Sequence, residues 1–275
     1  MLAAVKPSRQ DVPLPPFPPG LTWLRGPEPV SERVTARGPL LVHFFEVGEL
    51  SSVRTLPFIA GLHERLGPLG LTVIGVHSPR NALAAADADL EAALERLGID
   101  FAVANDSEHR IWHAYGCDRW PYTFLWRRGG TLRWAHYGEG AYHETEAEAR
   151  EEIAAITDGE LPASLLPSPS TDRPPDLVPP SPEQFPGGSY DVAWQSSAGE
   201  PLTVAYEGAG AWAALGGRGE VATTLDGGEA TTIEITAPGL YELAAHRVHG
   251  SHEVELRPGG SVAIWSLAFP PGVRG

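Results

Sequence analysis

Cysteine is almost absent from this sequence. The 275 residues contain a single one, Cys117. One sulfur atom can form no disulfide within the chain, no four-cysteine zinc site and no cysteine-held iron–sulfur cluster. The sequence therefore excludes disulfide-stapled folds and any reaction that needs two thiols on one chain.

Positive charge and long apolar runs are also scarce. The chain has 20 Lys+Arg against 35 Asp+Glu, so its formal net charge of −15 would repel a phosphate backbone. No stretch approaches the roughly 18 apolar residues of a membrane-spanning helix, and the N-terminus lacks the apolar core of a secretory signal. We expect no nucleic-acid partner, no membrane insertion and, by default, a cytoplasmic protein, or an extracytoplasmic one if a leader has been removed.

What the sequence does contain in quantity is proline and glycine, and these residues divide it. Its length is enough for two cores, and 42% of the residues are hydrophobic, which is ordinary for a globular protein. Eight prolines lie between residues 7 and 29, and nine lie between residues 158 and 188. We predict four parts: a proline-rich arm (1–29), a first domain (30–157), a Pro/Ser-rich semi-rigid linker (158–188) and a second domain (189–275).

The first domain alternates between strand and helix patterns. A βαβ unit is predicted from strands at 40–45 and 71–76 around a helix at 51–66. A second helix, a third strand, a hairpin and a closing helix are predicted at 87–98, 101–104, 122–137 and 143–156. Parallel βαβ units followed by an antiparallel hairpin and a helix predict a three-layer α/β domain.

The second domain has a different pattern, in which short Val/Thr/Ile/Leu-rich runs are separated by glycine-rich turns. The runs predicted as strands are 202–206, 220–225, 231–235, 240–243, 252–256 and 262–265. Short strands at this spacing predict a small all-β sandwich.

Several motifs of the first domain resemble a known family. They are Phe17-Pro18-Pro19-Gly20-Leu21-Thr22-Trp23-Leu24, Thr55-Leu56-Pro57, Val73-Ile74-Gly75-Val76-His77-Ser78-Pro79, Asn105-Asp106-Ser107, Ile111-Trp112-His113-Ala114-Tyr115-Gly116 and Trp120-Pro121. In this order they resemble the thioredoxin-like domains of the TlpA/ResA type, especially those joined to NHL-repeat propellers or to cytochrome-biogenesis-type membrane proteins. The resemblance covers residues 17–157 and implies a thioredoxin-like fold. The β-rich part loosely resembles the small sandwich that follows some of these domains.

The resemblance also implies where a reactive Cys-x-x-Cys pair would stand, and both cysteines are missing there. An alignment through Phe44-Phe45 and Leu56-Pro57 places Glu49-Leu50-Ser51-Ser52 at those positions. Dithiol–disulfide exchange needs one thiolate to attack and a second sulfur to resolve the mixed disulfide. We therefore expect no dithiol oxidoreductase activity.

Two interpretations of Glu49 remain open. At a helix N-terminus its carboxylate is favoured by the helix dipole, which suits an anion-modulated groove or an acid/base. The alternative is an ordinary first-turn glutamate in a helix that Ser51 or Ser52 caps.

A binding groove is implied by the position of Pro121, which matches the family's cis-proline. In the family this proline presents backbone groups to an extended peptide. The residues predicted to line the groove are Glu46, Glu49, Ser51, Ser52, Arg54, Trp120 and Pro121. Trp112 and Tyr115 suit either an aromatic partner-binding surface or the core-facing side of a helix.

Cys117 and the histidines are weaker candidates. A lone loop thiol near Arg119 can be glutathionylated, bridge subunits or act as a one-cysteine peroxidase, but most such cysteines are incidental. His246, His249 and His252 cluster in sequence, but they read as solvated loop histidines rather than as metal ligands. We expect no metal and no cofactor.

The sequence thus favours a redox-inactive thioredoxin-like protein that binds a protein or small ligand and is not an enzyme. One alternative is an enzyme using Glu49 as base, Ser52 or Ser51 as hydrogen-bonding group and Arg54 as anion partner. Others are a one-cysteine redox protein through Cys117 and a carbohydrate-binding sandwich that uses Trp194, Trp212 and Trp265. The sequence indicates neither the partner nor the oligomeric state.

Overall fold

The structure is a computed structural model that describes residues 12–29, 31–167, 176–197 and 199–275. Residues 1–11 of the predicted arm and 168–175 of the predicted linker lie outside these ranges. The chain forms two compact units. Unit 1 consists of residues 1–46, 51–78 and 97–170, and unit 2 consists of residues 47–50, 79–96 and 171–275.

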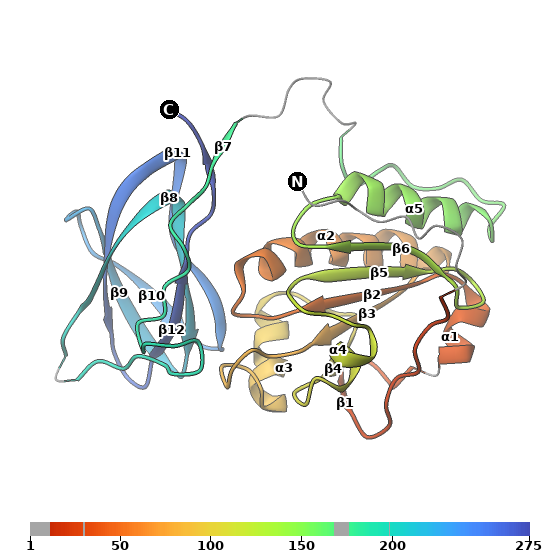
Figure 1. The fold of residues 1–275 in the computed structure, drawn as a ribbon, viewed down its shortest axis with the longest axis horizontal. Helices are drawn as coiled ribbons and strands as arrows, with labels where there is room; N and C mark the ends of the chain where they lie inside the picture. The colour runs from red at the N-terminus through yellow and green to blue at the C-terminus, as the bar shows by residue number, and fades with distance from the viewer. Residues whose placement is uncertain (1–11, 30, 168–175, 198) are drawn as a thin grey trace. The chain divides into compact units, whose positions relative to one another are not determined.

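Unit 1 is built on a six-stranded sheet with the order β1-β4-β3-β2-β5-β6 (Figure 1). Strands β2, β3 and β4 are parallel to one another, whereas β1, β5 and β6 are antiparallel to their neighbours. The strands are β1 (Thr22–Leu24), β2 (Leu40–Phe45), β3 (Thr72–His77), β4 (Ala102–Asn105), β5 (Tyr122–Trp126) and β6 (Leu132–Tyr137). All six residues of β2 are buried, as expected for a central strand covered on both faces.

The helices of unit 1 are amphipathic or short. They are α1 (Ser31–Arg37), α2 (Leu50–Leu66), α4 (Arg110–Ala114) and α5 (Tyr142–Ala154), with one 3₁₀ turn at Gly67–Leu69. Helix α2 buries Leu56, Ile59, Leu62 and Leu66, which recur at helical spacing. The predicted helices at 51–66 and 143–156 are therefore present, with ends shifted by one or two residues.

Two short elements were not expected from the sequence. Strand β1 lies within the predicted proline-rich arm, where Trp23 is paired with Ala104 of β4. Helix α1 has seven residues. Elements of this length carry too little periodicity to be recognised, and β1 exists because β4 offers it a free edge.

Part of the predicted linker is fixed on unit 1. The buried Glu146 carboxylate of α5 accepts hydrogen bonds from the Ser164 hydroxyl at 2.8 Å and the Leu165 N–H at 2.9 Å. The guanidinium group of Arg150 donates to Pro162 O at 2.8 Å. A Cβ atom on Gly61 of α2 would lie 2.9 Å from Leu165, so glycine allows this segment to lie close to the helix. Residues 162–165 therefore form a strap over unit 1.

Unit 2 contains a five-stranded antiparallel sheet with the order β10-β9-β11-β8-β12 and a two-stranded sheet of β13 and β7 (Figure 1). The strands are β7 (Leu177–Val178), β8 (Leu202–Gly216), β9 (Gly219–Leu225), β10 (Thr231–Ile235), β11 (Gly239–Pro258), β12 (Ala263–Ala268) and β13 (Gly272–Val273). Alternating residues of these strands, among them Val204, Val254 and Leu256, form its buried core.

Residues 47–50 and 79–96, the latter including helix α3 (Asp87–Arg96), belong to unit 2. The Leu240 N–H donates to Val47 O at 2.9 Å, and the Arg96 guanidinium lies 4.1 Å from the centre of the Tyr241 ring. A Cβ atom at residue 239 would lie 2.6 Å from the Arg96 side chain, and φ there is +135°, so this approach requires glycine.

The prediction of two separate strands with histidines in a loop between them was wrong, because a single strand, β11, covers both. It runs continuously for 20 residues through the segments predicted as 240–243 and 252–256. Ala245 pairs with Gly210 and Gly250 pairs with Gly208, so residues 246–249 stand opposite Ala209 alone. The three histidines therefore lie on one strand that carries a wide bulge.

No helix in the described part of the chain is long and apolar enough to cross a membrane.

Candidate functional site

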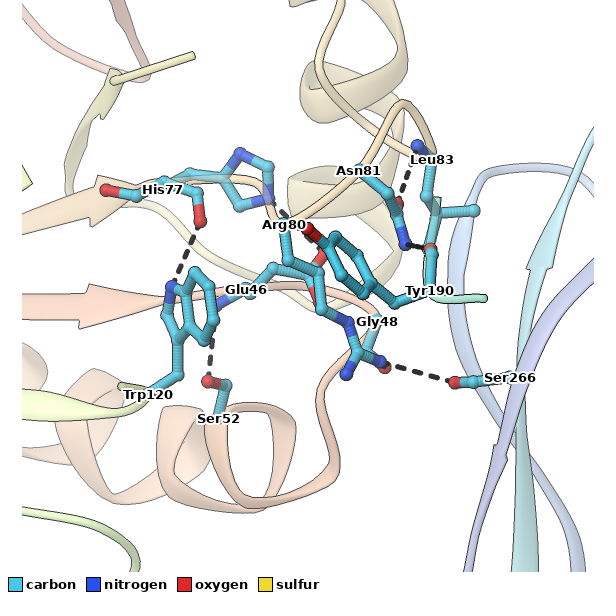
Figure 2. A network of polar contacts seen from close by, with 11 residues as sticks. Glu46, Gly48, Ser52, His77, Arg80, Asn81, Leu83, Trp120, Tyr190 and Ser266 are labelled. Carbon is cyan, nitrogen blue, oxygen red and sulfur yellow. Dashed lines mark hydrogen bonds and ion pairs between the residues drawn. The ribbon is translucent and has the colours of Figure 1, made fainter. Parts of the chain in front are cut away.

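A buried polar cluster lies where the parallel strands β2 and β3 end (Figure 2). Glu46 follows β2, His77 ends β3, and their side chains are 1% and 0% exposed. Glu46 Oε1 lies 4.0 Å from His77 Nε2, and the Glu46 N–H donates to the Ser52 hydroxyl at 3.2 Å. Glu46 and Ser52 were predicted site residues, whereas no sequence motif marked His77 as their neighbour.

Burial controls the charge of His77. Desolvation lowers its pKa from 6.5 to about 3, and His109 acts in the same direction. The ring is therefore neutral at pH 7, and the 4.0 Å approach joins a carboxyl group to a neutral imidazole rather than forming an ion pair. Neither ring nitrogen has a hydrogen-bond partner among the described residues.

A second histidine is buried in the central strand β2. His43 of β2 is 0% exposed, and its Nδ1 lies 2.9 Å from the Thr123 hydroxyl of β5. Desolvation lowers its pKa to about 3 as well, against a smaller opposing effect of a hydrogen bond to the Tyr122 backbone. Unit 1 therefore holds two neutral imidazoles within its core.

The four residues that were aligned with a Cys-x-x-Cys pair on the basis of sequence motifs are divided between the two units. Glu49 and Leu50 are half-buried and belong to unit 2, and Ser51 and Ser52 belong to unit 1. Ser52 is 0% exposed, so its hydroxyl does not reach solvent. Neither serine caps α2 in the way the sequence suggested, because the helix already begins at Leu50.

Two other predicted roles are not supported by the contacts. Arg54 was expected to act as anion partner in an active site, but its Nε pairs with Glu139 Oε1 at 3.0 Å. Glu46 and Ser52 were expected to line an open groove, but both are buried. The predicted groove residues of unit 1 that reach the surface are Ser51, Arg54 and Trp120, whereas Pro121 is buried.

The Trp120–Pro121 peptide bond is cis. The Trp120 side chain is half-buried, its ring centre lies 4.6 Å from that of Trp112, and its Nε1–H donates to Ser78 O at 3.0 Å. β5 begins only at Tyr122, which pairs with Phe44 and Tyr137. The main-chain N–H and C=O of Trp120 have no hydrogen-bond partner within the described residues.

Asp106 is the residue that holds this region together, and sequence reasoning did not assign it a role. Its fully buried carboxylate accepts hydrogen bonds from the Ile111 and Trp112 N–H groups at 3.0 and 2.9 Å. The Ser78 hydroxyl donates to the same carboxylate at 3.0 Å. Asp106 therefore fixes the start of α4, and with it Trp112, to the segment that follows β3.

Cys117 lies in the core and not on an open loop. The residue is 7% exposed and packs with Trp112 and Trp126. Burial raises the pKa of its thiol well above the ordinary range, and Asp118 and Asp106 add to this effect. Arg119, which was expected to favour the thiolate, pairs instead with Asp118 at 2.9 Å. The sulfur is therefore a poor nucleophile.

Arg80 organises the part of unit 2 that follows β3 (Figure 2). Its guanidinium group makes a two-pronged ion pair with the Glu183 carboxylate, with one N···O distance of 2.8 Å and a second of 2.5 Å. It also donates to Gly48 O at 3.2 Å and to the Ser266 hydroxyl at 3.3 Å. The carbonyl groups of Val47 and Gly48 are therefore both used within unit 2.

A surface hollow of about 660 Å³ lies elsewhere on unit 1. It is lined by His143, Glu144, Glu146, Ala147, Arg150, Ser164, Leu166 and Pro167. None of the predicted groove residues is among them. No group of three or more potential metal ligands is present among the described residues.

The tryptophans considered for a carbohydrate site are all half-buried. Trp194 packs against the core of unit 2, and a Cβ atom on Gly216 would lie 3.0 Å from Trp265 Nε1. Trp212 lies in β8. These contacts do not form an exposed aromatic face.

Comparison with known proteins agrees with the resemblance inferred from the motifs. No protein-family model matches the chain. The protein DipZ of Mycobacterium bovis is 24% identical over 294 residues, a match that covers 91% of this chain and 42% of DipZ. NHL repeat-containing protein 2 of Homo sapiens is 27% identical over 186 residues, which cover 65% of this chain and 24% of that protein. The chain thus spans less than half the length of these relatives.

Solved structures also align with this chain. A thioredoxin-like protein in the oxidized form aligns with a TM-score of 0.48 and 21% identity, covering 53% of this chain and 97% of that one. A thiol-disulfide isomerase from Corynebacterium glutamicum aligns with a TM-score of 0.44 and 17% identity, covering 52% of this chain and 97% of that one.

The predicted fold class is confirmed. The strand order of unit 1, with three parallel strands and an antiparallel hairpin at one side, is that of a thioredoxin-like fold, and unit 2 carries the predicted β-rich part. The chain matches part of DipZ and of NHL repeat-containing protein 2 in sequence, and it has a single cysteine.

Proposed function

We propose that this chain is a redox-inactive thioredoxin-fold protein that binds an extended segment of a partner protein at the Trp120–Pro121 edge. The observation that carries the proposal is the main chain of Trp120, whose N–H and C=O have no partner among the described residues. An extended peptide can satisfy both groups by pairing with this main chain, as in other cases of strand addition.

The thiol chemistry supports the first half of the proposal. Disulfide exchange requires an accessible thiolate and a second sulfur. Cys117 is the single cysteine, it is 7% exposed, and burial raises its pKa. The alternative of a one-cysteine redox protein therefore has little support.

The side chains around the edge support the second half. The half-buried Trp120 ring, held by Trp112 and Ser78, offers an apolar surface with a fixed orientation. Tyr137 pairs with Tyr122, the residue after Pro121, and the Arg119 guanidinium lies 5.3 Å from the centre of the Tyr137 ring. Rigid aromatic groups of this kind contribute contact area with little loss of side-chain entropy.

An enzyme that uses Ser52 and Glu49 is not favoured. The Ser52 hydroxyl is 0% exposed and accepts a hydrogen bond from the Glu46 N–H. A nucleophile or hydrogen-bonding catalyst must lie within about 3 Å of a substrate atom, and a buried hydroxyl does not meet this requirement.

The redox half is tested with insulin and dithiothreitol. We expect insulin precipitation at the rate of dithiothreitol alone, both for the wild-type chain and for Cys117→Ser. A rate above that background in the wild type, lost in Cys117→Ser, would reject the redox-inactive assignment.

The binding half is tested with fluorescently labelled, reduced and carboxymethylated α-lactalbumin, an unfolded chain without free thiols. We expect saturable anisotropy changes with the wild type and with Trp120→Phe, which keeps the main chain and an aromatic ring. Trp120→Pro removes the N–H donor and should abolish binding while near-ultraviolet circular dichroism shows an intact fold. Equal binding by Trp120→Pro would refute pairing at this edge, as would no binding by the wild type.

A further inference from the structure

The bulge of β11 is closed by two stacked imidazole rings. His246 is its first residue, and its ring centre lies 3.7 Å from that of His252, with only 13° between the ring planes. Between His246 and His252 lie the remaining bulge residues, 247–249, and then Gly250 and Ser251, where pairing with β8 resumes. The stack therefore joins the start of the bulge to the paired part of β11 that follows it.

Each ring is oriented by a hydrogen bond at one nitrogen. His252 Nδ1 lies 2.8 Å from Asp226 Oδ2, and Asp226 Oδ1 accepts a hydrogen bond from the Glu253 N–H at 2.8 Å. His246 Nε2 lies 2.8 Å from the Tyr206 hydroxyl. Tyr206 is 3% exposed and stacks on Phe269 with ring centres 4.7 Å apart. The rings are thus held from both sides, by a carboxylate and by a phenol.

The charged and titratable groups around the stack come from three elements. Asp226 follows β9, Tyr206 and Glu207 lie on β8, and Arg247, His249 and Glu253 lie on β11. Glu207 is engaged with the Ser251 hydroxyl at 3.4 Å. Burial raises the pKa of Tyr206 to about 12, so the phenol stays neutral. Burial and His252 lower the pKa of His246, and Asp226 opposes them.

We propose that residues 246–249 form an acid-opened bulge, closed when at least one of the stacked histidines is neutral and released when both carry a proton. The Asp226 carboxylate, 2.8 Å from His252 Nδ1, compensates a proton carried by the His252 ring. A proton on His246 as well places a like charge 3.7 Å away. At this separation repulsion is substantial even at the protein surface, so the stacked arrangement is lost.

The hydrogen bond to Tyr206 does not prevent this opening. With His246 neutral, the Tyr206 O–H donates to the Nε2 lone pair. With His246 protonated, Nε2–H donates to the phenol oxygen instead. The contact can persist in both states, so the stack of two like charges is the feature that changes.

The bulge is also the part of β11 with the fewest ties to β8. Its four residues have one residue, Ala209, opposite them, and Val248 is 42% exposed. His249 Nδ1 is buried without a hydrogen-bond partner among the described residues. Opening would carry the His249 side chain toward solvent, beside the already exposed Val248.

The test is amide hydrogen exchange of the full chain at pH 7.5 and pH 5.0, corrected for the intrinsic pH dependence of exchange. We expect protection in residues 246–249 to fall about 10-fold at the lower pH, corresponding to about one pK unit of coupling between the rings. His246→Gln keeps an acceptor for Tyr206 but cannot be charged, so its protection should change less than about 2-fold. The exposed unit 1 variant His113→Gln should retain the wild-type response.

If His246→Gln is unstable, Asp226→Asn and ring-proton NMR of the wild type test the same proposal. Asp226→Asn keeps an acceptor for the Glu253 N–H but removes the compensating charge, so the bulge should open at lower pH than in the wild type. In the wild type, the opening should follow the ring-proton NMR midpoint of His246. Equal protection at both pH values would overturn the proposal, as would a pH response retained in His246→Gln.

Discussion

The two units of this protein accommodate histidine in opposite ways. In unit 1, His43 and His77 are 0% exposed and have no carboxylate ion pair at neutral pH, and desolvation is the largest effect that keeps them neutral. In unit 2, His246 and His252 are partly exposed, and each is held by a polar partner and by the other ring. Burial controls the first pair, whereas the second pair is in direct contact as two stacked rings.

This difference indicates where each unit is sensitive to acid. Protonating a core histidine requires moving a charge out of water or unfolding the strands that hold it. Protonating a surface histidine requires only a local rearrangement. We therefore expect unit 1 to respond to acid by losing global stability and unit 2 by opening locally.

The largest expected effect is acid destabilisation of unit 1. The folded-state pKa values of His43 and His77 lie near 3 and the unfolded value near 6.5, so the unfolded chain binds more protons below pH 6.5. Stability is therefore lost as pH falls from 6.5 toward 3, by about 3 kcal/mol for each histidine at pH 4.5. Urea unfolding at several pH values, with hydrogen exchange of β2 and β3 amides, measures this loss.

Variants separate this effect from general acid denaturation. The double variant His43→Leu, His77→Leu should lose most of the slope between pH 6.5 and 4.5, and each single variant about half of it. His113→Gln changes an exposed histidine of unit 1 and should keep the full slope. An unchanged slope in the double variant would contradict control by burial.

The next effect in size concerns Cys117. Its reaction with 5,5′-dithiobis(2-nitrobenzoate) at pH 8 should be at least about 100-fold slower in the folded chain than in urea, because each unit added to the thiol pKa lowers the thiolate fraction tenfold. As control, Cys117→Ser combined with Ala114→Cys places the thiol at an exposed position of α4. That variant should react at nearly the unfolded rate. Rapid labelling of folded wild type would show that the thiol is accessible.

A smaller effect is expected at the strap of unit 1. Glu146→Ala leaves the Ser164 and Leu165 groups without their acceptor and should cost about 1–3 kcal/mol, with faster exchange of residues 163–165. Glu144 is exposed and lies two residues before Glu146, so Glu144→Ala should change the free energy of unfolding by less than about 0.5 kcal/mol. If both variants behave alike, the carboxylate of Glu146 does not hold the strap.

The smallest effect is expected in unit 2. Tyr206→Phe removes the hydroxyl that bonds His246 but keeps the stack on Phe269, so the free energy of unfolding should fall by about 1 kcal/mol. The ring-proton NMR midpoint of His246 should move while that of His77 stays unchanged. A large stability loss would show that the phenol hydroxyl supports more than the histidine stack.

Much of the fold could be predicted because its signals are local. The run Leu40–Phe45, the helical spacing of Leu56, Ile59 and Leu62, and the hairpin around Gly129-Gly130 all appear in the structure as predicted. Strand β1 could not be predicted, because its three residues become a strand only by pairing with β4. Strand β11 was divided in two, because Gly250 and the surrounding histidines resemble a turn when the partner strand is unknown.

The candidate site was predicted less completely, for a different reason. The missing dithiol and the position of Pro121 could be inferred from motifs. The burial of the site could not be inferred, because a glutamate at residue 46 or a histidine at residue 77 has the same sequence signature whether it faces solvent or the core. The contact between Glu46 and His77 depends on the register of β2 with β3, where Phe45 pairs with His77. Only a structure supplies that register.

The most direct test of the proposed function is an NMR titration of the ¹⁵N-labelled full chain with unlabelled, reduced and carboxymethylated α-lactalbumin. The account predicts that the amide signal of Trp120 and those of Tyr122 and Gly138 shift first and saturate together. Saturable shifts confined to unit 2, or none at Trp120, would contradict it.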